Sequence, residues 1–151
     1  LEPFGVHCVA YDPYIDKNIL AEFKIELIDF EKLLQLSNII SIHLPLTNET
    51  KKLINKDTFK KMTKSPIIIN TSRGSIINEY DLLEAYRENL ITGFALDVYE
   101  KEPVEKKFYD QISNDMNCIL TPHIAGVTEE SNFRVSKFIA ESTTKFFKNQ
   151  D

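Results

Sequence analysis

Short apolar runs, each followed by an amphipathic segment, are the feature of this sequence that most constrains its fold. A continuous apolar run is typical of a strand covered on both faces, whereas an alternating run is typical of a strand with one wet face. Such runs lie at residues 6–11, 25–28, 38–44, 67–69, 92–98 and 118–121. Segments with helical periodicity lie at residues 16–23, 30–36, 56–62, 79–89 and 129–147. The alternation predicts an α/β fold, a doubly wound parallel sheet with helices on both faces.

Local signals fix two of the helix starts. Asn55 precedes the segment 56–62 and Asn78 precedes the segment 79–89, and asparagine is a favoured N-cap residue. No internal repeat or low-complexity linker interrupts the 151 residues, which suffice for one domain with a core.

Composition excludes several classes of function. The net charge is -5, and no basic run occurs, so a nucleic-acid surface is not expected. No segment approaches the roughly 18 consecutive apolar residues of a membrane span, and no signal-peptide pattern begins the chain, so we expect a cytoplasmic protein. Cys8 and Cys118 lie inside apolar runs, which favours buried free thiols over a disulfide or a metal site.

Polar residues follow the apolar runs directly. In an open α/β sheet, ligands bind just beyond the carboxyl ends of the strands. Arg73 lies there in the stretch PIIINTSRGS, residues 66–75, and is placed to bind an anion. The alternative is a surface arginine that pairs with a nearby carboxylate.

Two later runs end in groups suited to proton transfer. Asp97 and Glu102 follow the run 92–98, although a solvated acidic loop would give the same pattern. His123 follows the run 118–121, and imidazole exchanges protons near neutral pH. Because parallel strands present their carboxyl ends to one edge of a sheet, we expect these groups and Arg73 to converge.

Two earlier strand ends are weaker candidates. Asp12 ends the run 6–11 and is placed to accept hydrogen bonds from ribose hydroxyls, but an Asp-Pro pair also begins ordinary turns. The loop from His43 to Thr50 ends the run 38–44, and we expect His43 itself to be a buried histidine within that strand. None of the four glycines forms a G-x-G-x-x-G phosphate loop.

Four motifs together resemble the D-isomer-specific 2-hydroxyacid dehydrogenases, which include phosphoglycerate, D-lactate, glycerate and formate dehydrogenases. The motifs are IHLPLTNETKKLIN, IIINTSRGSIINEYDLLEAY, GFALDVYEKEP and LTPHIAGVTEES. Their order and approximate spacing match the family over about residues 4–148. The resemblance implies a Rossmann-like fold, NAD as cofactor, and hydride transfer between the nicotinamide and a D-2-hydroxy or 2-keto acid.

The resemblance also implies roles for individual residues. Arg73 resembles the arginine that binds the substrate carboxylate and carbonyl oxygen, His123 the acid/base, and Glu102 the carboxylate that keeps this histidine protonatable. Asp12 resembles the ribose-binding acid that disfavours NADP, and Asp97 the contact to the nicotinamide carboxamide. The remaining expected residues of the cofactor groove are Leu44, Pro45, Thr50 and Thr71. The family also implies a small-acid substrate of unspecified identity and a homodimer.

Some parts of the family fold have no counterpart in residues 1–151. These parts are a separate substrate domain and the first strand, glycine loop and helix of the NAD domain. In the strand order 3-2-1-4-5-6, the absent strand lies between the strands at 6–11 and 38–44, so we expect two sheet fragments with unpaired edges. We therefore interpret residues 1–151 as a partial NAD-binding domain of a longer polypeptide. We expect the isolated chain to be inactive. We also expect no high-affinity NAD binding to it, because the helix N-terminus that holds the pyrophosphate is absent, and tight NAD binding in calorimetry would contradict that expectation.

A second hypothesis comes from another functional class. Relatives of this fold act as nucleotide-sensing corepressors, so the chain could serve as a non-catalytic binding module or an inactive interaction fragment. Together, Arg73, Glu102 and His123 favour catalysis. A glycine loop and a substrate domain encoded upstream of Leu1 would favour the enzyme, whereas a native start at Leu1 would favour the alternative.

Overall fold

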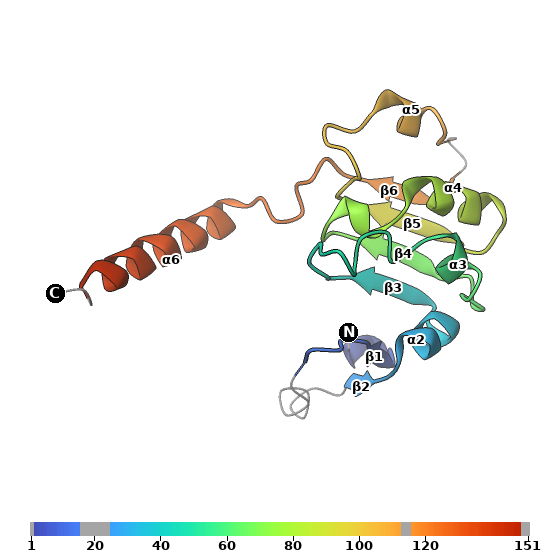
Figure 1. The fold of residues 1–151 in the computed structure, drawn as a ribbon, viewed down its shortest axis with the longest axis horizontal. Helices are drawn as coiled ribbons and strands as arrows, with labels where there is room; N and C mark the ends of the chain where they lie inside the picture. The colour runs from blue at the N-terminus through green and yellow to red at the C-terminus, as the bar shows by residue number, and fades with distance from the viewer. Residues whose placement is uncertain (1, 16–24, 113–115, 149–151) are drawn as a thin grey trace.

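The strands of the computed structural model, which describes residues 2–15, 25–112 and 116–148, form two separate parallel sheets (Figure 1). The smaller sheet pairs β1 (Cys8–Ala10) with β2 (Ile25–Leu27). The larger has the order β3 (Ile39–Ile42), β4 (Ile67–Asn70), β5 (Gly93–Leu96) and β6 (Cys118–Leu120). Every pairing is parallel, which confirms the predicted class of sheet.

Helices connect the strands as the periodicity predicts, with changes in their bounds. They are α2 (Phe30–Leu36), α3 (Lys56–Phe59), α4 (Glu79–Arg87), α5 (Lys106–Tyr109) and α6 (Glu129–Lys148). Two short 3-10 helices, η1 (Glu2–Phe4) and η2 (Gly74–Ile76), complete the set. Helix α3 ends earlier than predicted, α5 was not predicted, and the predicted helix at 16–23 lies outside the described residues. None of the described helices is both long enough and apolar enough to cross a membrane.

The two predicted N-caps are confirmed. The Asn55 side chain accepts a hydrogen bond from the Asp57 amide at 2.9 Å and a longer one from the Thr58 amide. The Asn78 side chain accepts one from the Asp81 amide. Each bond satisfies an amide that has no partner within its own helix, so these asparagines set the first residues of α3 and α4.

One face of the larger sheet carries the core. Ile40, Ile68 and Phe94 are neighbours in register on β3, β4 and β5, and each is at most 7% exposed. They belong to one buried cluster with Leu34 of α2, Phe59 of α3, and Leu82 and Leu83 of α4. Helices α2, α3 and α4 therefore cover this face, and their packing fixes the carboxyl ends of β3, β4 and β5.

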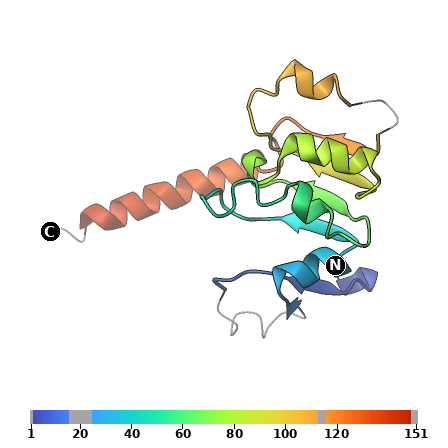
Figure 2. The same ribbon diagram turned by 45° about the vertical axis from the view of Figure 1, so that its right-hand side comes forward.

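The opposite face of the larger sheet is exposed in the described part of the chain. Ile39 on β3 and Ile119 on β6 are 57% and 68% exposed. Helix α6 does not cover this face, since it extends away from the sheets in both views (Figures 1 and 2). No residue of α6 is buried.

The two sheets are separated between β1 and β3, where the sequence predicts an interruption. Among the described residues, β1 pairs only with β2, and β3 pairs only with β4. Helix α2 connects β2 to β3, and the Tyr11 ring packs against the Phe30 ring at 5.3 Å between centroids. One hydrogen bond spans the gap, from the Tyr14 hydroxyl to Glu49 Oε2 at 2.9 Å. The predicted pair of sheet fragments is therefore confirmed.

Gly74 allows the backbone after β4 to pack directly against the backbone after β5. A Cβ atom on Gly74 would lie 1.9 Å from the Tyr99 carbonyl carbon, a contact that backbone atoms cannot relieve without moving. We predict that Gly74→Ala destabilises the fold by about 1 to 3 kcal/mol, the usual cost of overpacking. Chemical unfolding of the two proteins measures the difference.

Gly126→Ala is the matched control for this prediction. A Cβ atom on Gly126 meets no other atom within 4 Å, so the same added methyl group should leave the unfolding midpoint nearly unchanged. Equal stability of Gly74→Ala and Gly126→Ala would show that the two backbones do not approach this closely.

Candidate active site

The candidate site lies at the carboxyl ends of three neighbouring strands. Arg73 follows β4, Glu102 follows β5, and His123 follows β6. Because β5 pairs with both β4 and β6 in parallel, the three segments leave the same edge of the sheet. The convergence expected from the sequence is therefore present in the fold.

Asn70 shapes the turn that carries Arg73. Its side chain is fully buried; Oδ1 accepts hydrogen bonds from the Ser72 amide at 3.0 Å and the Ser72 hydroxyl at 2.9 Å. Its amide nitrogen donates to the Arg73 carbonyl at 3.0 Å. The sequence analysis did not single out Asn70, although a polar residue that ends an apolar run is the signal for such a role. Asn70 holds the first turn after β4 in one conformation.

The Arg73 side chain is exposed and available to an anion. Its Nη1 donates to the Ser72 carbonyl at 2.6 Å. Within residues 2–15, 25–112 and 116–148, no carboxylate lies within 4.0 Å of this guanidinium. The alternative of a surface ion pair therefore finds no support in the described part of the chain.

His123 and Glu102 form a direct pair. His123 Nδ1 lies 2.8 Å from Glu102 Oε2, and Glu102 Oε1 accepts a hydrogen bond from the Tyr99 amide at 3.1 Å. The hydrogen bond with His123 lowers the pKa of Glu102; burial opposes this effect, and the Tyr99 amide adds to the lowering. Glu102 is thus ionised at neutral pH and accepts the Nδ1 proton, which leaves Nε2 to exchange a proton with a ligand.

His123 has a left-handed backbone conformation, with φ of 56°, which is unfavourable for a residue with a Cβ atom. Asp97 anchors the segment around it. Asp97 Oδ1 accepts hydrogen bonds from the Ile124 amide at 2.9 Å and the Thr121 hydroxyl at 2.5 Å, and Oδ2 accepts one from the Ala125 amide at 2.9 Å. These bonds hold the His123 backbone in place on both sides.

Burial alone would raise the pKa of Asp97, which is 4% exposed. The hydrogen bonds from Thr121, Ala125 and Ile124 outweigh burial and lower the pKa, so Asp97 remains ionised. The structure thus gives Asp97 an anchoring role that the sequence analysis missed. Its contact with a nicotinamide carboxamide stays a prediction.

The loop after β3 is closed by its own hydroxyl groups. The Thr50 hydroxyl donates to the Pro45 carbonyl at 2.6 Å and accepts a hydrogen bond from the Thr47 amide at 2.8 Å. Leu44 packs against the core, whereas Pro45 is exposed. Thr71, the first residue after β4, is also exposed. These positions lie at the carboxyl ends of two paired strands, as the predicted cofactor groove requires.

The prediction that His43 is buried within a strand is wrong. His43 is exposed and follows the last residue of β3, and its Nε2 lies 2.8 Å from the Ser41 hydroxyl. The reason is its place at the edge of the larger sheet. By strand alternation His43 shares the face of Ile39 and Ser41, which no described helix covers.

Asp12 and the cysteines complete the predicted residues. Asp12 follows β1, is exposed, and accepts a hydrogen bond from the Tyr14 amide at 2.9 Å, so it does initiate a turn. Cys8 and Cys118 are partly buried free thiols, and burial raises the pKa of the Cys118 thiol. Among the described residues, no group of three or more histidine, cysteine or acidic side chains is arranged to hold a metal ion.

Residues 1–125 match the family of D-isomer specific 2-hydroxyacid dehydrogenases in its NAD binding domain. A D-3-phosphoglycerate dehydrogenase of Archaeoglobus fulgidus is 38% identical over 143 residues, which are 95% of this chain and 27% of that protein. A glyoxylate reductase of Korarchaeum cryptofilum is 34% identical over 143 residues, which are 95% of this chain and 42% of that protein.

Solved structures show the same architecture. The apo-structure of D-lactate dehydrogenase from Escherichia coli matches with a TM-score of 0.82 and 32% identity, over 98% of this chain and 46% of that one. An NAD-complexed D-isomer specific 2-hydroxyacid dehydrogenase from Lactobacillus delbrueckii ssp. bulgaricus matches in fold with a TM-score of 0.85 and 24% identity, over 98% and 47%. The chain thus spans less than half the length of these relatives.

The anchoring role of Asp97 predicts a specific dependence of stability on pH. Because the pKa of Asp97 is lowered in the fold, its contribution is complete above the ordinary aspartate range of about 4 and is lost as the pH falls through the lowered pKa. We predict that Asp97→Asn reduces the free energy of unfolding by about 1 to 3 kcal/mol at neutral pH. The difference from the unsubstituted chain should shrink in acid.

Urea unfolding at several pH values measures this difference. Asp110→Asn is the control, since Asp110 is an exposed acid whose side chain accepts no hydrogen bond from the described residues. A constant difference across pH for Asp97→Asn would contradict an ionised anchor.

Proposed function

The chain belongs to the D-isomer-specific 2-hydroxyacid dehydrogenase family, and from this premise we propose that it forms most of the NAD-binding half of an oxidoreductase. The reaction is hydride transfer between nicotinamide and a D-2-hydroxy acid or its 2-keto acid. The observation that carries the proposal is the convergence of Arg73 with the paired Glu102 and His123 at the ends of three adjacent parallel strands.

The matched family domain binds NAD, and the residues present fit this cofactor at several positions. Asp12 is an exposed carboxylate at the end of β1, suited to accept hydrogen bonds from ribose hydroxyls and to repel a 2′-phosphate. Leu44, Pro45, Thr50 and Thr71 lie at the ends of β3 and β4, where the groove is proposed, and Asp97 is the proposed contact to the carboxamide. When bound, NAD supplies the hydride acceptor, and NADH the donor.

The protein groups supply a proton and charge. In reduction, His123 Nε2 donates a proton to the carbonyl oxygen of the keto acid, and in oxidation it takes that proton back from the hydroxyl. Glu102 holds the imidazole through Nδ1, which orients Nε2 toward the substrate oxygen. The exposed guanidinium of Arg73 binds the substrate carboxylate and the carbonyl oxygen through two parallel hydrogen bonds, which orients the carbon that is reduced.

We also propose that residues 1–151 are a partial NAD-binding domain and that further polypeptide supplies the substrate domain. The separation of β1 from β3, where the strand order 3-2-1-4-5-6 has a further strand, and the share of the relatives that the chain covers support this proposal. The isolated chain should then have little activity. The apolar residues exposed on α6 are consistent with an interdomain contact or with the homodimer that we propose. A cytoplasmic location is part of the same proposal.

The substrate is a small D-2-hydroxy or 2-keto acid whose side chain these residues do not specify. The complete polypeptide that contains this domain should oxidise NADH when supplied with one or more members of a panel of 2-keto acids, and should prefer NADH to NADPH. We predict that His123→Ala lowers kcat on the best substrate by about 10²- to 10⁴-fold, the usual value of a positioned acid/base. Steady-state absorbance at the NADH band measures both.

Two outcomes of this assay would count against the proposal. Activity of the unsubstituted protein on no member of the panel would favour the non-catalytic alternative. Normal turnover by His123→Ala would remove His123 from the acid/base role.

Arg73→Lys should be poorly tolerated in the same protein. Lysine keeps the charge but cannot form two parallel hydrogen bonds to a carboxylate, so we predict that kcat/KM for the keto acid falls about 10- to 100-fold. The control is Arg87→Lys on α4, whose guanidinium donates to the Gln111 carbonyl at 3.2 Å, away from the strand ends. Equal kinetics for the two variants would remove Arg73 from substrate binding.

A further inference from the structure

We propose that Lys52, Glu79 and Glu100 are positioning residues. They hold the turn after β4 that carries Arg73 (the Arg73 turn) and the loop after β5 that carries Glu102 (the Glu102 loop) in the relative positions that the proposed reaction requires. The inference rests on the proposed function, because it concerns the residues to which that function assigns the chemistry. These three residues come from three of the four motifs quoted above, and none of them is among the residues to which the proposed function gives a role.

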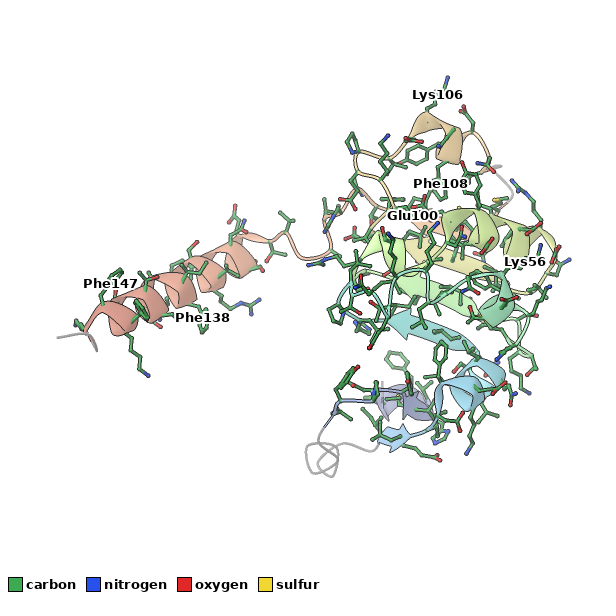
Figure 3. All side chains as sticks on the ribbon, in the orientation of Figure 1. Lys56, Glu100, Lys106, Phe108, Phe138 and Phe147 are labelled. Atoms are coloured by element: carbon green, nitrogen blue, oxygen red, sulfur yellow. The ribbon has the colours of Figure 1, made fainter. Side chains whose placement is uncertain are left out.

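Glu79 and Glu100 exchange hydrogen bonds with each other's backbone. The Glu79 carboxylate accepts the Glu100 amide at 2.6 Å, and the Glu100 carboxylate accepts the Glu79 amide at 2.9 Å. Glu79 is the first residue of α4, and Glu100 lies in the loop after β5, where Figure 3 labels it. The exchange ties the start of α4 to this loop at two points, in the manner of a capping box formed between distant segments.

The exchange brings the carboxylates of Glu79 and Glu100 close together, and a nearby cation reduces the repulsion between their negative charges. Lys52 Nζ lies 3.5 Å from Glu100 Oε2. Burial raises the pKa of Glu79; the Glu100 amide and Lys52 lower it, while the charges of Glu100 and Glu105 raise it further. Lys52 is thus the group that offsets the repulsion between the two acids.

Each member of this network is attached to one of the proposed catalytic segments. The Lys52 amide donates to the Ser75 carbonyl at 2.8 Å, two residues after Arg73. Lys52 itself has a left-handed backbone, with φ of 52°. Glu100 lies two residues before Glu102, in the same loop. The Lys52 side chain and the Glu79–Glu100 exchange therefore connect the Arg73 turn to the Glu102 loop.

A neighbouring carboxylate, that of Asp81, forms a similar contact that involves none of the proposed catalytic segments. Asp81 also lies in the first turn of α4 and accepts a backbone amide of another segment, that of Lys56 at 2.9 Å. Its partner begins α3, which carries none of the proposed catalytic residues. Lys56, labelled in Figure 3, likewise forms an ion pair with Glu84 at 2.9 Å. Its side chain is about as exposed as that of Lys52. Asp81 and Lys56 therefore differ from Glu79 and Lys52 chiefly in the segment that they hold, which is α3 for the first pair and the Glu102 loop for the second.

Matched variants of the complete enzyme test the inference. Glu79→Ala and Asp81→Ala each remove one acid from the first turn of α4 and leave one backbone amide without its acceptor. We expect both to lower the thermal midpoint by similar amounts. Only Glu79→Ala should lower kcat, by about tenfold or more, while KM for NADH stays within about twofold, because a displaced catalytic group costs rate without changing cofactor contacts.

Conservative replacements sharpen the same test. Glu79→Gln keeps an oxygen that can accept the Glu100 amide, so it should recover most of the lost kcat. Lys52→Met keeps the side-chain stem and removes the charge, so it should lower kcat several-fold, whereas Lys56→Met should not.

Hydrogen exchange gives a readout that does not depend on activity. The backbone amides of residues 99–102 should exchange faster in Glu79→Ala than in Asp81→Ala. Equal exchange of these amides, or equal kcat in the two alanine variants of an active enzyme, would overturn the inference. An unsubstituted protein that reduces no 2-keto acid would instead overturn the proposed function, and the exchange of residues 99–102 would still decide whether the network holds the loop.

Discussion

Parallel pairing of β4, β5 and β6 is the constraint on which the rest of the site depends. Parallel strands place every carboxyl end on one edge, so three residues far apart in sequence are delivered to one region of the fold. If β5 ran the other way, Glu102 would begin at the opposite edge, and His123 would lose the partner that lies 2.8 Å from its Nδ1. The parallel sheet thus determines the edge at which the candidate site lies, and local hydrogen bonds determine the positions of its side chains.

Those local bonds follow a common rule. Near each strand end a polar side chain accepts a backbone amide: Asn70 that of Ser72, Glu102 that of Tyr99, and Asp97 that of Ile124. Glu100 accepts the amide of Glu79, which begins α4 and has no acceptor within that helix. A buried amide without an acceptor is costly, so these residues are required for folding as well as for placing the reactive groups. Glu102 also contacts His123 Nδ1, and Asp97 holds the amides of Ile124 and Ala125, so bonds that stabilise the turns also place the proposed acid/base.

Patterns within a few residues were sufficient to predict the strands, the caps at Asn55 and Asn78, and the edge where the site lies. Contacts between distant segments were not predictable in this way. Examples are the hydrogen bonds of the buried Asn70 side chain, the anchoring bonds of Asp97 and the Glu79–Glu100 exchange. The residues that these bonds join are close only in the packed fold. Helix α5 was missed because its four residues carry two lysines and bury only Phe108. His43 was placed inside a strand because its exposure depends on which sheet face lacks a covering helix.

The separation of β1 from β3 divides the proposed site into two physical parts. Arg73, Glu102 and His123 follow strands of one sheet, and these strands share a single buried cluster with the covering helices α2, α3 and α4, so their relation is set by this sheet and its helices. Asp12 lies on the other sheet, which the described residues connect to the first through α2, the Tyr11–Phe30 contact and the Tyr14–Glu49 bond. The contacts that fix the Glu102–His123 pair are therefore distinct from the contacts that fix Asp12, the proposed ribose-binding residue. Changes that move Arg73, Glu102 or His123 should act on the reaction rate, whereas changes across the gap should act on affinity for the cofactor, because they move Asp12 relative to the proposed groove residues of the larger sheet.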